Sequence, residues 1–374
     1  MTGKEIIKYL EDWAPKGIAW DKDNVGIQVG NPALKIKNIM LSLDLNEVVI
    51  DSAIKENCNL IITHHPLLFY PLKKLDFSGN KTSMMVEKLI KNNILLYSAH
   101  TNLDFTKHGV SYQLAKRLTL ENIKFLKNLS ENQLKLSVFV PLTHVEKVAK
   151  AIHKAGAGVI GEYSNCSFRT DGMGTFRGSN KSNPSIGRKE VIEFVEEVKL
   201  EVLVDSWKLN DVIVSMKKDH PYDEVAFDVF PLKNLNVNYG IGAIGDLSKA
   251  MQKKEFLNFV SSKLKTSCLR YVKGKVNSIK TVAVCGGSCA ELIDEAMKQN
   301  ADAFITADLK YHTFQDAEGR ILLIDAGHYE TEVPILDELK SRMQKLLIEN
   351  KNIRVLKFKG STNPIFYYNK SGAN

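Results

Sequence analysis

An internal repeat constrains the fold of this chain more than any other feature of its sequence. A shift of 243 positions aligns residues 39–65 with residues 282–308 without a gap. Each stretch predicts a strand, a turn, a helix and a second strand, and such β-α-β units build parallel sheets. An apolar strand at 94–96 likewise matches one at 321–323. The identical ungapped positions include, in the first copy, Asp51, Ala53, Lys55, Asn57, Ile62 and Thr63. We therefore expect two duplicated α/β halves related by pseudo-symmetry.

Three of the predicted strands end in imidazole and carboxylate side chains. Neighbouring histidines can serve one site only where a strand ends and the backbone turns, and Pro66 marks such a turn after the first strand. Strand ends of one polarity converge on one crevice of a parallel sheet, so the two halves are expected to share a site. The groups that follow strands 59–63, 94–98 and 321–325 are His64 and His65, His100 and Asp104, and His328 and Glu332.

The segment between the two halves has a different pattern. A β-α-β, β-α-β order of this size predicts a ferredoxin-like α+β module, inserted where the attachment points of the host lie close together. We expect residues 1–127 and 237–374 to form a discontinuous, largely parallel-sheet α/β core that binds metal, and residues 128–236 to form the inserted domain. The predicted elements of the insert are strand 134–140, helix 143–155, hairpin 164–177, strand 199–205, helix 206–218 and strand 224–230.

Composition excludes several classes of function. The net charge of +8 comes from 51 basic and 43 acidic residues spread along the chain without basic runs, which indicates a solvated surface and argues against nucleic-acid binding. Five cysteines without a C-x-x-C pair favour a reducing compartment over a disulfide framework or zinc ribbon. No apolar run reaches the ~18–20 residues of a membrane span, and the N-terminus lacks a signal core. A cytoplasmic protein with no membrane partner is expected.

Motifs in both halves resemble those of the Nif-three-like family, whose bacterial members are commonly named GTP cyclohydrolase I type 2 homologues. Two departures are visible. Trp20 stands two residues further from Asn24 than in the usual motif, and Cys289 occupies a position where another small residue is expected. The motifs that carry the resemblance are residues 23–26, 63–69, 100–104, 308–312 and 325–332.

The resemblance implies a centre of two divalent metal ions per subunit. It also implies an insert similar to PII and CutA-type modules and assembly into ring-shaped homohexamers. Neutral imidazoles and carboxylates without thiolates suit zinc, manganese or iron, with zinc the usual family metal. The ligands implied by the family are His64, His65, Asp104, His328 and Glu332.

Two function hypotheses follow. Two ions ~3.5–4 Å apart can share the Asp104 carboxylate and lower the pKa of a bound water towards ~7. The resulting metal-bound hydroxide could hydrolyse a C–N bond of a purine ring, a formamide or a phosphoester. The family label favours a nucleotide, as in a GTP cyclohydrolase. The alternative is a regulatory module that binds metal or a small molecule without turnover.

Further candidates lie beside the predicted ligands. His100 and His312 are the candidate catalytic residues, although His100 could equally be a core histidine. Asp308 has the register of His65, so it is expected at the same crevice, where it and Lys310 could hold substrate or water. Asp308 could instead cap a helix. By contrast, we expect Asp44 and Glu330 to have structural roles.

Overall fold

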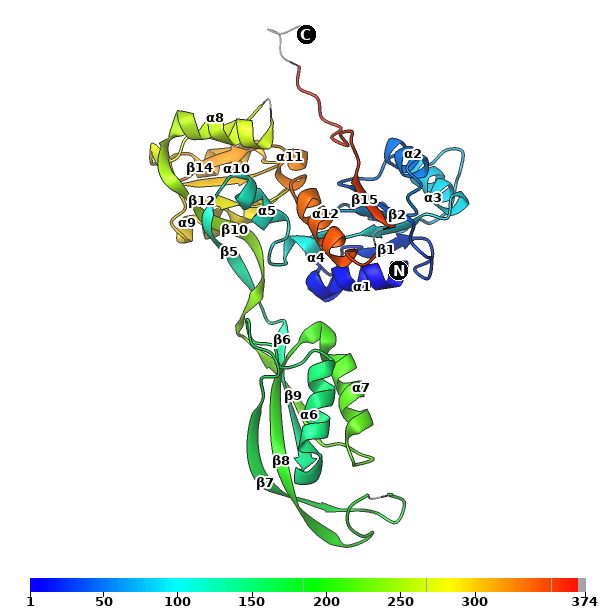
Figure 1. The fold of residues 1–374 in the computed structure, drawn as a ribbon. Coiled ribbons are helices and arrows are strands. Elements are labelled where there is room, and N and C mark those ends of the chain that lie inside the picture. The colour runs from blue at the N-terminus through cyan, green and yellow to red at the C-terminus, as the bar shows by residue number, and fades with distance from the viewer. Residues whose placement is uncertain (184, 267, 351, 369–374) are drawn as a thin grey trace. The chain divides into compact units, whose positions relative to one another are not determined.

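A computed structural model of the chain describes residues 1–183, 185–266, 268–350 and 352–368. The chain divides into two compact units, one formed by Met1–Lys127 with Tyr239–Asn374 and the other by Asn128–Asn238 (Figure 1). The described residues form a mixed α/β fold with three sheets. The predicted core segment 237–374 includes residues 369–374, which lie outside the described part. Within that part, no helix has the length and apolar character required to cross a bilayer.

The first sheet of the core unit contains four parallel strands. Its edge strand β1 is antiparallel to β4. Alternate strand residues face two helical layers. Leu41 and Ile62 pack towards α1 (Gly3–Trp13) and α12 (Ile335–Leu346), and Met40 packs towards α2 (Glu47–Lys55) and α3 (Lys81–Lys91). In spatial order the strands are β1 (Gly26–Val29), β4 (Leu95–Ser98), β3 (Leu60–Thr63), β2 (Asn38–Ser42) and β15 (Arg354–Lys357).

The second sheet departs in part from the prediction of a largely parallel core, because among its described pairings those that join β12, β13 and β14 are parallel. Strands β10 and β11 flank them in antiparallel orientation. The long strand β10 was missed because glycines at 240, 242 and 245 weaken the strand pattern. In spatial order the strands are β11 (Arg270–Val272), β14 (Leu322–Asp325), β13 (Ala303–Thr306), β12 (Ser278–Val284), β10 (Leu235–Gln252) and β5 (Glu121–Ser130).

The repeat is visible in the register of the two sheets. Ile39 pairs with Leu60 between β2 and β3, and Val282 pairs with Ala303 between β12 and β13, so both partners are displaced by the same 243 positions. The helices between these strands differ in their caps. The side chain of Asn46 accepts a hydrogen bond from the backbone of α2, whereas the repeat places Cys289 there and no side chain caps the helical turn that follows.

One helix from each half of the core packs on the sheet of the other half. Helix α5 (Val110–Arg117) follows the strands of the first sheet but packs on the second sheet, together with α8 (Lys253–Leu264). Helix α12 follows the strands of the second sheet but packs on the first. The two halves are therefore packed together through α5 and α12. The remaining helices of the core are α4 (Thr101–Asp104), α9 (Ile293–Lys298), α10 (Tyr311–Ala317), α11 (His328–Glu332) and the 3-10 turns Lys16–Ile18 and Ala290–Leu292.

The second unit is an antiparallel sheet covered on one face by two helices, and its strands lie in the order β7-β8-β6-β9. The predicted hairpin at 164–177 is wrong, because β7 is one strand paired along its length with β8. Gly172 and Gly174 suggested a turn, yet neither has a positive φ. The elements are β6 (Gln133–Pro141), the 3-10 turn Leu142–His144, α6 (Val145–Lys154), β7 (Phe168–Arg177), β8 (Ile192–Asp205), the 3-10 turn Ser206–Lys208, α7 (Leu209–Asp219) and β9 (Phe227–Leu232).

The exchanged helix α12 should stabilise the core through Leu339, which is fully buried against the first sheet. Replacing it with alanine in Leu339→Ala leaves a cavity and should lower the free energy of unfolding by about 2–5 kcal/mol. Urea unfolding followed by circular dichroism measures this change. The control Ile348→Ala removes a comparable side chain that is 65% exposed and should change stability little. Equal effects of the two substitutions would contradict the packing of α12.

Candidate metal centre

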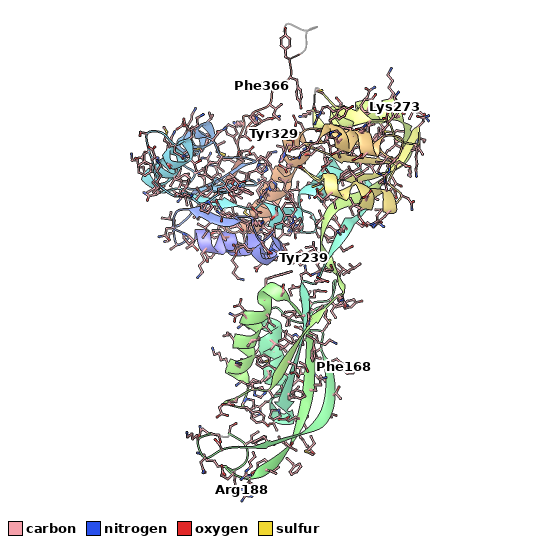
Figure 2. All side chains as sticks on the ribbon, turned by 180° about the vertical axis from the view of Figure 1, so that it is seen from behind. Phe168, Arg188, Tyr239, Lys273, Tyr329 and Phe366 are labelled. Carbon is pink, nitrogen blue, oxygen red and sulfur yellow. The ribbon has the colours of Figure 1, made fainter. Side chains whose placement is uncertain are left out.

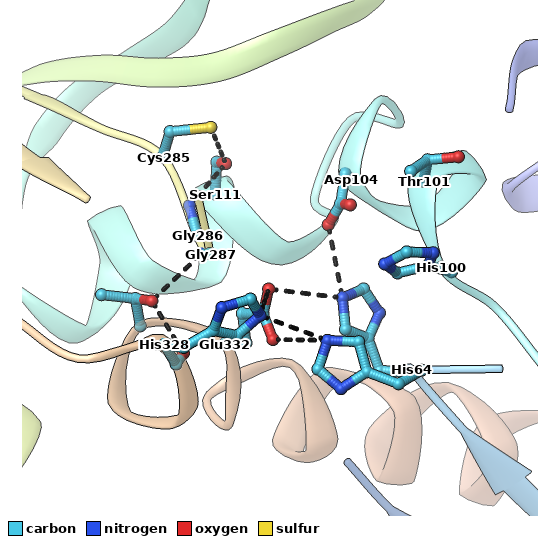
Figure 3. A network of polar contacts seen from close by, with 12 residues as sticks. His64, His100, Thr101, Asp104, Ser111, Cys285, Gly286, Gly287, His328 and Glu332 are labelled. Carbon is cyan, nitrogen blue, oxygen red and sulfur yellow. Dashed lines mark hydrogen bonds and ion pairs between the residues drawn. The ribbon is translucent and has the colours of Figure 1, made fainter. Parts of the chain in front are cut away.

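Four histidines and two carboxylates gather where strands of the two halves of the core end (Figure 3). The first half contributes side chains that follow β3 and β4, and the second half contributes the two ends of α11. Because α11 is one short helical turn, its first and last residues lie on one face. The residues brought together are His64, His65, His100, Asp104, His328 and Glu332.

Each of the four histidines is anchored through its Nδ1 atom. A carbonyl or carboxylate oxygen only accepts, so in each pair Nδ1 carries the proton and donates it. The Nε2 atoms of the three rings that contact Glu332 are left facing the cluster. Histidine ligands of metal ions are held in this way. The partners of His64, His65, His100 and His328 are the Ala99 carbonyl at 2.8 Å, Asp44 at 2.7 Å, Asp23 at 2.9 Å and Asp308 at 2.7 Å.

Glu332 lies at the centre of the cluster, with only 3% of its surface exposed. Its Oε2 is 3.1 Å from His65 Nε2, and its Oε1 is 3.1 Å from His328 Nε2 and 3.8 Å from His64 Nε2. Burial opposes ionisation, but the three imidazoles outweigh it and hold the pKa of Glu332 well below its ordinary value. The cluster therefore favours positive charge beside this carboxylate.

The pKa values of two of the imidazoles agree with positive charge beside Glu332. Burial lowers the pKa of His65, but hydrogen bonds to Asp44 and contact with Glu332 outweigh burial and raise it to about 10. The same competition, with Glu332 and Asp308 as the partners, raises the pKa of His328 to about 9. Protons on these rings occupy a position that a cation would compete for, since neutral imidazole is the form that binds metal.

The spacing of the donor atoms fits a divalent ion. His65 Nε2 and His328 Nε2 are 3.3 Å apart and each is 3.1 Å from Glu332. Two ligands each ~2.0–2.1 Å from a tetrahedral zinc ion lie about 3.3 Å apart. Among the buried side-chain atoms of the described chain that lack a hydrogen-bond partner, three lie at the cluster, namely His64 Nε2, Asp104 Oδ1 and Glu332 Oε2. Such groups are costly unless something pairs with them, and a cation would.

Two overlapping sets of three residues could hold metal ions, and within each set the candidate ligand atoms lie within 4.8 Å of one another. One set is His65, His328 and Glu332. The other is His64, His65 and His100, although the sequence suggested no ligand role for His100. The His100 ring lies 5.2 Å and 5.3 Å from the rings of His64 and His65.

Asp104 belongs to neither set but borders the cluster. Its Oδ1 is 3.6 Å from His64 Nε2, and its side chain is 23% exposed. Desolvation and the nearby negative charge of Glu332 raise the pKa of Asp104 well above its ordinary value. A carboxylate in this setting gains most from a neighbouring cation, because a cation would offset both effects.

Of the other predicted site residues, only Asp308 touches the cluster. It contacts His328 and does not cap α10, whose N-cap is Lys310. Lys310 and His312 make no hydrogen bond or ion pair with the cluster in the described part of the chain, and His312 Nδ1 instead lies 3.3 Å from Gln315. The Gly286-Gly287 pair makes room for Glu332, since a Cβ at Gly287 would lie 2.4 Å from Glu332 Oε1.

Two residues assigned structural roles from the sequence lie at the cluster instead. Asp44 bonds His65, and Glu330 lies on α11 between His328 and Glu332. Asp44 ends a predicted strand just as the ligand-bearing segments do. The rule that carboxylates at strand ends converge therefore applies to Asp44 as well, and its place at the cluster could have been predicted from the sequence.

Comparisons with known proteins agree across the whole chain. The family model described as Duf34/NIF3 (NGG1p interacting factor 3) matches residues 1–364. A protein of Halalkalibacterium halodurans named GTP cyclohydrolase 1 type 2 homolog is 38% identical over 353 residues, covering 94% of each chain. The crystal structure of a Bacillus cereus protein related to NIF3 has a TM-score of 0.82 and 35% identity, covering 98% of this chain and 99% of that one. Staphylococcus aureus protein SA1388 has a TM-score of 0.77 and 30% identity, with the same coverage.

The anchoring carboxylates should control metal affinity. We expect Asp308→Asn and Asp44→Asn each to weaken zinc binding about 10–100-fold, because a neutral amide supports the imidazole less well than a carboxylate. Asparagine tolerates the left-handed backbone of Asp308, where φ is 55°, so melting of the metal-free protein should change little. Competition with a chromophoric chelator measures the affinity.

Asp316→Asn, at an exposed position of α10, is the matched control and should bind zinc like the unmodified protein. Earlier melting of Asp308→Asn with unchanged zinc affinity would show that this carboxylate serves only the local backbone.

Proposed function

We propose that this chain, which belongs to the Duf34/NIF3 family, is a hydrolase that depends on two divalent metal ions and acts on a nucleotide. One observation carries the proposal. A buried carboxylate meets three imidazole Nε2 atoms from both halves of the core, and each ring is anchored behind by its Nδ1. We assign as the residues that would hold the ions His64, His65, Asp104, His328 and Glu332.

Bound divalent ions would polarise the substrate and lower the pKa of coordinated water, and the donor set suits zinc, with manganese or iron as alternatives. The chain itself orients the donors. His100 lies beside His64 and His65, and its Nδ1 donates to Asp23. We assign it proton exchange with the substrate through its Nε2, because a positioned imidazole can act as general acid or base near neutral pH. We assign no such role to His312.

An aromatic surface beside the cluster supports a nucleotide as substrate. The ring of Phe69 lies 6.3 Å from the ring of His100 and is 43% exposed, and Tyr70 lies edge-on to Phe69 and is 78% exposed. A planar base can stack on such faces. The names of the relatives, GTP cyclohydrolase 1 type 2 homolog, favour the same class of substrate.

The second candidate function is a module that binds metal or a small molecule without turnover. It is favoured by a cavity of about 570 Å³ in the second unit, lined by residues that include Arg177, Lys181 and Tyr222. The β-α-β-β-α-β order and the strand order of that unit support our assignment of it as an inserted ferredoxin-like domain.

Three further assignments complete the proposal. By resemblance, the subunits form a ring-shaped homohexamer. The five free thiols favour the reducing environment of the cytoplasm. Small molecules, and neither nucleic acid nor membrane, are the expected partners. Gel filtration with light scattering measures the first of these directly.

Turnover distinguishes the two candidate functions. Protein saturated with zinc or manganese is incubated with a panel of purine and pyrimidine nucleotides, and chromatography follows the products. We expect hydrolysis of at least one nucleotide, and loss of it in Asp104→Ala because a carboxylate that would hold the ions is gone. Asp316→Ala, which removes an exposed carboxylate, should retain activity. Tight metal binding without turnover of any member of the panel would favour the module instead.

The aromatic surface can be tested with the substrate found in that panel. Phe69→Ala should raise KM about 5–150-fold, which corresponds to the ~1–3 kcal/mol of stacking a base on an aromatic ring, and should change kcat less. Phe77→Ala is the matched control, since Phe77 is similarly exposed at 45% and makes no ring contact with the cluster histidines in the described structure. A fall in kcat with unchanged KM would contradict a stacking role.

A further inference from the structure

The C-terminal segment leaves the first sheet at the edge where the metal centre lies. Strand β15 is parallel to β2, and Lys357 pairs with Leu41 in their common register. The next residue, Phe358, donates its backbone N–H to the Leu41 carbonyl at 2.9 Å. Because both strands run in one direction, the chain continues past the end of β2 towards Asp44, without further helix or strand up to Tyr368 (Figure 1).

Thr362 in this segment bonds the carboxylate that anchors His65. Its hydroxyl donates to Asp44 Oδ2 at 2.7 Å, while His65 Nδ1 donates to Asp44 Oδ1 at 2.7 Å. Each oxygen of the carboxylate thus accepts a hydrogen bond from a different partner, which restrains its rotation. Burial opposes ionisation of Asp44, but the bonds from His65 and Thr362 keep the pKa of this carboxyl below its ordinary value.

The next residue contacts the other half of the core. The side-chain amide of Asn363 donates to Glu330 Oε1 at 3.0 Å, and Glu330 lies on α11 between the two donors of that helix. Residues 362 and 363 therefore join the two halves at the rim of the cluster. Further along, the segment is exposed, and Phe366 projects into solvent with 92% of its surface accessible (Figure 2).

The other anchoring carboxylate of the cluster provides an internal comparison. Asp308 holds His328 at 2.7 Å, as Asp44 holds His65. Within the described residues, however, the Asp308 carboxylate bonds His328 alone, and its side chain is 49% exposed. In the described chain, a hydroxyl therefore supports the aspartate of the Asp44–His65 pair, whereas none supports the aspartate of the Asp308–His328 pair.

We propose that Thr362 is a positioning residue of the metal centre, whose hydroxyl holds Asp44 so that His65 keeps its Nδ1–H on the carboxylate and its Nε2 towards the ion. This inference rests on the metal centre proposed above. It gives the C-terminal segment a role in metal binding, although Thr362 lies far in sequence from Asp44 and His65. Residues that hydrogen-bond a metal ligand affect metal binding because they fix the orientation and the basicity of that ligand.

The test compares Thr362→Val, which keeps the shape and removes the hydroxyl, with Thr362→Ser, which keeps the hydroxyl. Zinc affinity is measured on the full chain by chelator competition, and the melting temperature is measured without metal. We expect Thr362→Val to bind zinc about tenfold more weakly. This is the lower end of the range of affinity losses seen when a residue that supports a metal ligand is removed. Thr362→Ser should restore the affinity, and the metal-free melting temperatures should agree.

The matched control is Ser361→Ala, which removes a neighbouring hydroxyl that accepts a bond from the Asn363 backbone and does not touch Asp44. It should leave zinc affinity unchanged. A double-mutant cycle then identifies the route of the effect. Thr362→Val should have no further effect in an Asp44→Ala background, and its full effect in an Asp308→Ala background.

The outcomes separate this inference from the proposed function. Absence of zinc binding by the unmodified protein would overturn the metal centre and with it the role of Thr362. Normal zinc binding that Thr362→Val leaves unchanged would overturn the role of Thr362 alone. An equal loss of affinity with and without Asp44 would also overturn it, because the threonine would then act by docking the segment rather than by holding the carboxylate.

Discussion

The site depends on one buried carboxylate, Glu332, which is paired with imidazoles from both halves of the core. Glu332 is 3% exposed and lies against the Nε2 atoms of His64, His65 and His328. Burying an ionised carboxylate without such partners costs several kcal/mol. The two halves that supply these partners are packed together by the exchange of α5 and α12 between the two sheets. The packing that joins the two halves therefore also brings the residues of the site together.

Duplication supplied the scaffold, and divergence made the single site. The two copies keep the same strand register, yet in the second copy an aspartate, Asp308, stands at the register of His65, and Gly287 stands at that of Asp44. Each change has a visible consequence. Gly287 leaves the space that Glu332 occupies, and Asp308 supports His328 from behind. The two copies therefore contribute different side chains to one cluster between the halves.

Sequence reasoning reached the repeat, its parallel strands and the convergence of the strand-end histidines, because each depends on local apolar patterning that a strand end exposes directly. It failed where glycine obscured that pattern, as in β10 and in β7, which had been predicted as a hairpin. It also assigned Asp44 a structural role and gave Thr362 no role. Contacts between residues hundreds of positions apart leave no local periodicity, so only the assembled sheet reveals that β15 delivers Thr362 to the site.

The central claim is that the cluster holds divalent metal, and diffraction from crystals grown with zinc tests it most directly. Data collected above and below the zinc absorption edge locate the ions without reference to any activity. The account predicts two anomalous peaks about 3.5–4 Å apart among the side chains of His64, His65, Asp104, His328 and Glu332. Peaks confined to other parts of the chain, or a cluster whose Glu332 contacts only protonated imidazoles at saturating zinc, would contradict it.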